Sequence, residues 1–251
     1  MKQIQLDSLQ MNVYETRELM GQAAGKAIED TINKILLQKN NIRIIFAAAP
    51  SQNEVLAYLK NSKNIDWSKI TCFHMDEYIG LPIENPALFS NFLDKHLFDE
   101  LQLSTFYKIN SLNEIQDEIN RYEQLLREAP IDICIMGIGE NGHIAFNDPP
   151  FAKFDDMHFV KEIQLDNISR QQQVNDGCFK SIQEVPTHAI TLTIPALISA
   201  EKIFCIVPGP TKTEALYRLI EEEINENMPA TILRKHVNAL LFTDESCYQK
   251  G

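Results

Sequence analysis

The sequence predicts an α/β fold: a single domain built on a mostly parallel, doubly wound sheet with helices on both faces. Short apolar runs rich in β-branched residues alternate with longer segments of helical period. No repeat, low-complexity tract or Gly/Ser linker divides the chain. Its 251 residues, 44% of them hydrophobic, suffice for one sizeable core. We therefore expect one domain over residues 1–251.

The first half of the chain supplies two strands and the helices around them. IRIIFAAA predicts a strand at 42–49 and ITCFHM predicts one at 70–75, because both runs are short, apolar and rich in β-branched or aromatic residues. The spacing of apolar residues predicts helices near 13–37 and 51–61, before and after the first strand. The same spacing predicts a helix at 87–98 after the second strand.

The second half continues the alternation. IDICIMGIG, KIFCIVPG and NALLFTD predict strands at 131–139, 202–209 and 238–244. A helix is expected at 113–127, before the first of these strands, and another at 211–220, after the second. Strands that alternate with helices pair in parallel and are covered on both faces, which is a Rossmann-like arrangement. Ligands of such sheets bind beyond the carboxyl ends of the strands. We therefore expect a functional site at that edge.

Composition and charge narrow the classes of partner. A formal net charge of −12 argues against nucleic acid, since phosphate backbones need clustered Lys and Arg. An anionic metabolite stays compatible if positive groups converge in a cleft. The first ten residues lack the apolar stretch of a signal peptide, and no run approaches the roughly 20 apolar residues of a membrane span. Five cysteines without metal-ligand spacing predict reduced core cysteines in a cytoplasmic protein.

The stretch HMDEYIGLP places Asp76 directly after a predicted strand, with Glu77 beside it. A carboxylate at that edge serves as a general base when a proton lies within hydrogen-bond reach. The alternative is a solvated turn, since Asp is common in turns and Gly80 and Pro82 are typical of one. On this stretch alone the turn is the favoured interpretation.

The stretch GIGENGHIAFNDPP follows another predicted strand. Gly139 and the glycines around it allow close approach of backbone to a ligand, and His143 is a natural proton donor and acceptor near neutral pH. Asp148 or Glu140 could orient the imidazole, and Asn141 could hold that ring or a substrate hydroxyl. A histidine satisfied by backbone is the alternative, but so many polar side chains after a core strand favour function. No metal is expected, because one His with scattered acids lacks ligand spacing.

Two strand-to-helix turns are candidates for anion binding. PGPTK places Lys212 in the first turn of a predicted helix, whose N-terminus attracts anions. In APSQNE, Ser51 and Glu54 fit an S-x-x-E capping box, which would occupy free amides and so argues against a strong phosphate cradle. Ser51 and Gln52 could still donate hydrogen bonds. Neither turn has P-loop spacing, and the glycines at 137–142 do not form a dinucleotide fingerprint.

Together these stretches resemble the glucosamine-6-phosphate deaminase (isomerase) family, within a superfamily that includes the 6-phosphogluconolactonases. FHMDEYIGLP and GIGENGHIAFNDPP carry most of the resemblance. VPTHAITLTIPALISA, PGPTK and ILRKHVNA support it, so that it covers about residues 42–244. MDEY and GHIAFN are similar to the deaminase branch, because lactonases typically carry an Arg after the acid pair.

The resemblance implies conversion of glucosamine 6-phosphate to fructose 6-phosphate with loss of ammonia, without metal or redox cofactor. Asp76 would move the proton between C2 and C1, His143 would open the pyranose ring, and Lys212 would bind the phosphate. The implied partner is a small sugar phosphate, with no nucleic acid and no membrane, and a homo-oligomer stays open.

Departures from the family pattern indicate a divergent subgroup. Asn141 and Asp148 stand where the family usually has Asp and Glu, and Glu140 could replace the lost charge. AAAPSQNE replaces the Gly-rich phosphate turn, and Arg170 is the one arginine in the segment ISRQQQVNDGCF. The predicted substrate contacts are Ser51, Gln52, Glu77, Gly139, Arg170 and Lys212. Two alternatives remain: a lactonase-type hydrolase with His143 as the base towards water, and a sugar-phosphate-binding regulator without catalysis.

Overall fold

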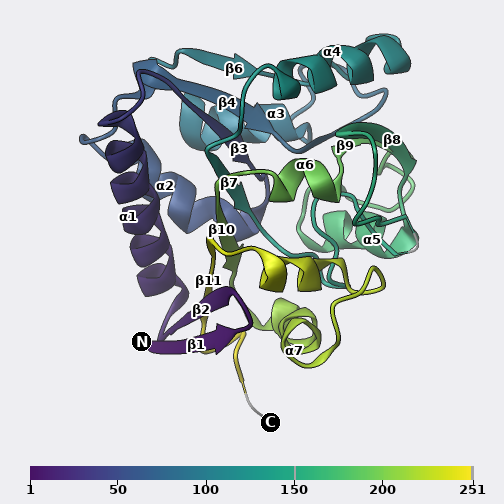
Figure 1. Cartoon of the computed structure of the whole chain (residues 1–251). Coiled ribbons are helices and arrows are strands. Elements are labelled where there is room, and N and C mark those ends of the chain that lie inside the picture. Colours follow the sequence, from purple (N-terminus) through teal and green to yellow (C-terminus); the bar gives the residue numbers. More distant parts are fainter. Residues whose placement is uncertain (150, 250–251) are drawn as a thin grey trace.

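The computed structural model describes residues 1–149 and 151–249, and within them the main sheet runs in the order β1-β2-β11-β10-β7-β3-β4-β6 (Figure 1). The strands are β1 (Lys2–Leu6), β2 (Leu9–Tyr14), β3 (Ile42–Phe46), β4 (Ile70–His74), β6 (Thr105–Tyr107), β7 (Ile133–Met136), β10 (Lys202–Val207) and β11 (Ala239–Asp244). Neighbouring strands are parallel, except that β1 and β2 form an antiparallel hairpin. The predicted α/β fold with a mostly parallel sheet is confirmed.

Helices cover both faces of this sheet (Figure 1). One face carries α1 (Arg17–Leu36), α2 (Asn53–Asn61) and α3 (Phe89–Leu93), and the other carries α4 (Ile115–Arg127), α6 (Ile194–Ile198) and α7 (Thr213–Glu221). Alternation along each strand divides the core between the faces. On β3, for example, Ile44 and Phe46 pack with the cluster under α1 and α2, whereas Ile45 packs with the cluster under α4. Among the described residues, no helix combines the length and apolarity that crossing a membrane requires.

The first helix begins later than predicted. Residue 13 lies in β2, and α1 starts at Arg17 because the Thr16 hydroxyl accepts a hydrogen bond from the Leu19 amide at 3.3 Å. The predicted helix at 87–98 is α3 followed by a π-helical turn, Asp94–Phe98. Helix 211–220 is a 3₁₀ turn, Pro210–Lys212, followed by α7.

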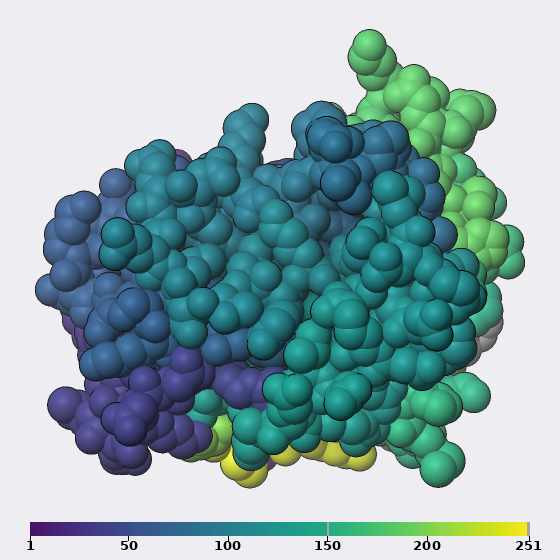
Figure 2. Space-filling view, turned by 90° about the horizontal axis from the view of Figure 1, so that it is seen from above, coloured from purple at the N-terminus to yellow at the C-terminus, as the bar shows by residue number. Residues whose placement is uncertain are grey.

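A second sheet, which the sequence did not reveal, lies beside the main one (Figure 1). Its antiparallel strands run in the order β5 (Asp76–Tyr78), β9 (His188–Leu192), β8 (Val160–Gln164). Helix α5 (Asn167–Asn175) joins β8 to β9, and the green part of the chain that follows α5 projects from the body of the molecule (Figure 2). Because β5 begins at Asp76, this sheet positions one of the predicted functional residues.

Candidate functional site

One cavity lies where β3, β4, β7 and β10 end, and the turns that follow these four strands all contribute residues to it. The space of about 810 Å³ between its walls includes open solvent at the mouth, so the cavity is accessible from outside. Of the predicted site residues, those that line it are Ser51, Gln52, Asp76, Gly139, His143 and Lys212. Residues far apart along the chain thus share one hollow at the carboxyl edge of the sheet.

Asp76 stands at the start of β5 with its backbone fixed by a buried histidine. The His74 Nδ1–H donates to the Asp76 carbonyl at 2.9 Å, and His74 Nε2 accepts from the Ile109 amide at 2.9 Å. Burial lowers the pKa of His74 to about 3, so this ring is neutral, as both hydrogen bonds require. Burial, followed by the charge of Glu77, raises the pKa of Asp76 to about 8. Asp76 is therefore a carboxyl group tuned towards neutral pH.

Glu77 lies outside the cavity, because adjacent side chains of a strand point to opposite faces of the sheet and Asp76 faces the cavity. Its carboxylate accepts hydrogen bonds from the Phe89 amide at 3.0 Å, and from the Ser90 amide and hydroxyl at 2.9 and 2.8 Å. Burial raises the pKa of Glu77, although these hydrogen bonds oppose the shift. In this position, Glu77 fixes the start of α3 rather than facing a ligand.

His143 is held by three oxygen atoms around one ring nitrogen. Its Nδ1 lies 2.7 Å from Asn141 Oδ1, 2.9 Å from Asp148 Oδ1 and 3.1 Å from Ser169 Oγ. Because Asn141 Oδ1 and the Asp148 carboxylate can only accept hydrogen bonds, we place a proton on Nδ1, which leaves Nε2 as the nitrogen free to exchange a proton with a ligand. The shorter side chain of Asp148 therefore still reaches the imidazole. Its carboxylate supplies the negative charge that Asn141 lacks.

The carboxylate of Asp148 is the centre of this network. Asn141 Nδ2 and Ser169 Oγ donate to its Oδ1 at 2.7 and 2.6 Å. Burial alone would raise the pKa of Asp148, but the charge of His143 and the hydrogen bonds from His143, Asn141 and Ser169 outweigh burial and lower the pKa. Asp148 therefore stays an anion and orients the imidazole. The predicted alternative partner, Glu140, does not line the cavity, and its backbone N–H donates to Gln172 Oε1 at 3.1 Å.

Gly139 is required by the ring of His143. A Cβ atom at residue 139 would lie 2.1 to 2.4 Å from three ring atoms of His143. We predict that Gly139→Ala forces the ring away from Asp148 and lowers the free energy of unfolding by about 1–3 kcal/mol. Chemical denaturation of the variant and the native protein measures this difference. Equal stability would show that the ring has room to move.

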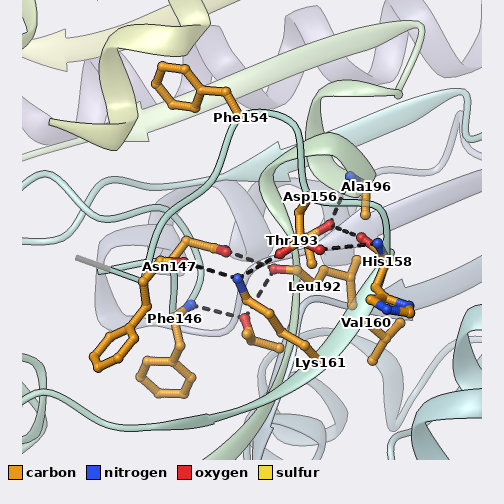
Figure 3. Close-up of polar contacts among 12 residues, drawn as sticks. Phe146, Asn147, Phe154, Asp156, His158, Val160, Lys161, Leu192, Thr193 and Ala196 are labelled. Carbon is orange, nitrogen blue, oxygen red and sulfur yellow. Dashed lines mark hydrogen bonds and ion pairs between the residues drawn. The ribbon is translucent and has the colours of Figure 1, made fainter. Parts of the chain in front are cut away.

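The loop that carries His143 is tied to β9 (Figure 3). Asn147 Nδ2 donates to the Leu192 carbonyl at 2.8 Å, and the Phe146 amide donates to Thr191 Oγ1 at 3.1 Å. Further along, Lys161 Nζ binds Asp156 at 3.0 Å, while Thr193 Oγ1 donates to the His158 carbonyl at 2.7 Å (Figure 3). In β9, Thr191 is also the register partner of Asp76. One strand therefore positions both Asp76 and the His143 loop; Pro150, at the end of that motif, lies outside the described residues.

The anion-binding turns differ from the prediction in one respect. The S-x-x-E capping box is wrong: neither the 3₁₀ turn Pro50–Gln52 nor α2 has a side-chain cap. Glu54 instead forms an ion pair with Arg17, its Oε1 lying 2.8 Å from Arg17 Nε. Ser51 and Gln52 line the cavity, and the Oε1 of Gln52 is buried without a partner among the described residues. The turn therefore presents polar side chains to the hollow.

Lys212 lines the cavity from the turn after β10. Its side chain is almost fully buried, and burial lowers its pKa, while the charges of Asp176 and Glu140 act in the opposite direction. Gly209, at a φ of 84°, makes the turn that brings Lys212 forward, and its amide donates to Asp244 Oδ2 at 2.8 Å. A buried ammonium at a cavity wall favours an anionic group beside it.

Arg170 does not reach the cavity. Its Nη2 donates to the carbonyls of Ile182 and Val185 at 2.7 and 2.9 Å, so the guanidinium holds the chain that follows α5. Several lining residues are absent from the predicted site: Arg17, Phe89, Gln172, Gln173, Asp176 and Thr211. The unusual SRQQQ segment was a signal for the glutamines and for Ser169, whereas no motif indicated Arg17.

Comparison with known proteins finds relatives along almost the whole chain. Residues 15–242 match the family described as glucosamine-6-phosphate isomerases/6-phosphogluconolactonase. A glucosamine-6-phosphate deaminase of Bacillus cytotoxicus is 35% identical over 234 residues, which cover 93% of this chain and 86% of the relative. One of Bacillus cereus (strain B4264) is 33% identical over 236 residues, with the same coverage of 93% and 86%.

Solved structures show the same fold. A monomeric glucosamine-6-phosphate deaminase superposes with a TM-score of 0.86 at 27% identity, covering 95% of this chain and 98% of its own. A 6-phosphogluconolactonase from Thermotoga maritima superposes with a TM-score of 0.76 at 18% identity, covering 93% of this chain and 98% of its own. The similarity in sequence is thus greater to the deaminases.

Proposed function

Because the chain belongs to the family of glucosamine-6-phosphate isomerases and 6-phosphogluconolactonases, we propose that it converts glucosamine 6-phosphate and water to fructose 6-phosphate and ammonia. The observation that carries this proposal is the meeting of Asp76, His143 and Lys212 in one cavity. A carboxyl, an imidazole and an ammonium are what proton transfer on a phosphorylated sugar requires. We also propose that the chain is one domain and acts in the cytoplasm, which its five free cysteines support.

Ring opening is assigned to His143. Nε2 takes the proton of the C1 hydroxyl and delivers a proton to the ring oxygen as the bond between C1 and that oxygen breaks, which gives the open-chain aldehyde and returns His143 to its starting state. Asp148 stabilises the charge on the ring from the Nδ1 side, at 2.9 Å. Asn141 and Ser169 hold Asp148 and so keep the imidazole in one orientation.

Isomerisation is assigned to Asp76. Its carboxylate removes the proton from C2 and returns it to C1, while a proton passes from the amine nitrogen to the C1 oxygen. The amine-bearing carbon thereby becomes an imine, which water hydrolyses to the ketone and ammonia. A pKa of about 8 makes Asp76 a stronger base than an ordinary carboxylate, and it is suited to a carbon-bound proton. The one substrate proton thus returns to the substrate, and one water is consumed for each ammonia released.

The direct test uses the purified full chain with glucosamine 6-phosphate. We expect ammonia and fructose 6-phosphate in equal amounts, measured by coupled assays. Hydrolysis of 6-phosphogluconolactone is measured in parallel. Turnover of the lactone without release of ammonia would replace the proposal by the hydrolase alternative, and binding without any turnover would favour the regulator.

Lys212 is the proposed phosphate contact from the 3₁₀ turn. We expect Lys212→Met to raise KM for glucosamine 6-phosphate by about 10- to 100-fold, because a charge-assisted contact is lost while apolar packing is kept. Initial rates over a range of substrate concentrations measure KM and kcat separately. A fall in kcat with unchanged KM would show that Lys212 acts on the reaction rather than on binding.

A further inference from the structure

Arg17 reaches the cavity from outside every motif that predicts the site. It is the first residue of α1, yet it lines the same hollow as Ser51, Gln52 and Lys212. A positive charge at the first turn of a helix is unfavourable to the helix dipole. The stability of α1 therefore does not explain an arginine there.

The guanidinium is fixed against the turn after β3. Its Nη2 donates to the Pro50 carbonyl at 2.6 Å, and its Nε lies 2.8 Å from Glu54 Oε1, an ion pair without the alignment of a hydrogen bond. Ser51 and Gln52, which line the cavity, lie between these two contact points in the chain. The Nη1 atom has no partner among the described residues, so N–H groups remain for a ligand.

The remaining cationic groups do not suffice for a phosphate dianion. Arg170 is occupied by two carbonyls outside the cavity. The positive charge of Lys212 is partly offset by the nearby negative charges of Asp176 and Glu140. The turn itself offers no glycines, and Pro50 has no N–H. A planar guanidinium matches two phosphate oxygens at once, and Arg17 is the lining residue with that shape.

We propose that Arg17 is a second cationic contact for the phosphate group of the substrate, held in place by Glu54 and the Pro50 carbonyl. This inference rests on the proposed function for the identity of the substrate. The anion site then joins a helix that begins the fold to turns that follow β3 and β10. The guanidinium would supply donors at a turn that has no glycine and whose Pro50 has no N–H.

The test compares Arg17→Ala, Arg17→Lys and Glu54→Gln with the native protein. We expect Arg17→Ala to raise KM for glucosamine 6-phosphate, and the inhibition constant of inorganic phosphate, by about 10-fold, with kcat within about threefold. Arg17→Lys retains the positive charge but not the planar guanidinium that can bind two phosphate oxygens at once, so its KM should be intermediate. Glu54→Gln removes the charge that holds the guanidinium in place, so its KM should rise, but by less than that of Arg17→Ala.

The matched control is Arg127→Ala, because Arg127 also pairs with a glutamate, Glu123 at 2.8 Å, and donates to a carbonyl, that of Met157. It lies on α4, outside the cavity, and its replacement should leave KM unchanged. An unchanged KM in Arg17→Ala, or equal rises in KM for Arg17→Ala and Glu54→Gln, would overturn the inference in favour of a structural ion pair.

Calorimetric titration with inorganic phosphate separates this inference from the proposed function. If the native protein does not consume glucosamine 6-phosphate but binds phosphate more tightly than Arg17→Ala, the proposed function is wrong and the anion contact stands. If phosphate binds both proteins equally, the anion contact is wrong whatever the substrate is.

Discussion

Replacing Asp76 with asparagine is expected to lower kcat by about 10²- to 10⁴-fold, the usual contribution of a general base. Asparagine keeps the size of the side chain but cannot take the C2 proton. Because burial raises the pKa of the native carboxyl, its removal should not lower stability. Steady-state rates and thermal unfolding of the same preparation measure both effects. Full activity in this variant would reject Asp76 as the base.

The same variant has a pH signature in stability. The folded-state pKa of Asp76, about 8, lies above its ordinary value of 3.8. Its contribution to stability is therefore fully present below pH 3.8 and is lost as pH rises towards about 8. Relative to the native protein, Asp76→Asn should gain free energy of unfolding over that window. Denaturation at pH 5 and pH 8 measures the gain.

The neighbouring acid, Glu77, supplies a control in which stability rather than catalysis is expected to change. Glu77→Gln removes acceptor capacity from a carboxylate that receives hydrogen bonds from Phe89 and Ser90. We expect stability to fall by about 1–3 kcal/mol, since buried donors lose their partner. If Glu77→Gln instead lost catalysis with unchanged stability, Glu77 and not Asp76 would face the substrate.

Replacing His143 with asparagine is expected to lower kcat by about 10²- to 10⁴-fold, because no other ring in the described part of the cavity can protonate the pyranose oxygen. KM should change little, since the phosphate contacts remain. Asp148→Asn keeps the imidazole but removes the charge that orients it, so an intermediate loss is expected. Initial-rate kinetics at one pH measures both variants. A His143→Asn enzyme with more than a tenth of native kcat would exclude ring opening by His143.

The strands that end at the cavity were predictable because they are buried on both faces and read as continuous apolar runs. The polar residues after them, Asp76 and His143, stand out for the same reason: polarity begins abruptly where a core strand ends. Strand–helix alternation then indicates that these ends share one edge of the sheet. Fold and reacting groups are thus encoded locally.

The second sheet and the partners of the site were not predictable in this way. β5 is three residues long and carries two acids, so nothing in its pattern indicates a strand. Ser169 and Arg17 reach the site through tertiary packing of α5 and α1, which residue spacing does not record. The Glu54 capping box was wrong because the ion pair with Arg17 competes with the local contact. The sequence therefore indicated contacts between neighbouring residues, but it did not indicate contacts between residues far apart in the chain, such as the ion pair of Arg17 and Glu54.

The attachment of both Asp76 and the His143 loop to β9 has a consequence for how this enzyme changes. The distance between Asp76 and His143 is set by β9, a strand that carries no reacting group of its own. We therefore expect substitutions in β9, at residues such as Thr191, to change the length of sugar that fits between Asp76 and His143 without changing either of these residues. Relatives that act on other sugars should therefore differ from this chain in β9 while they keep Asp76 and His143.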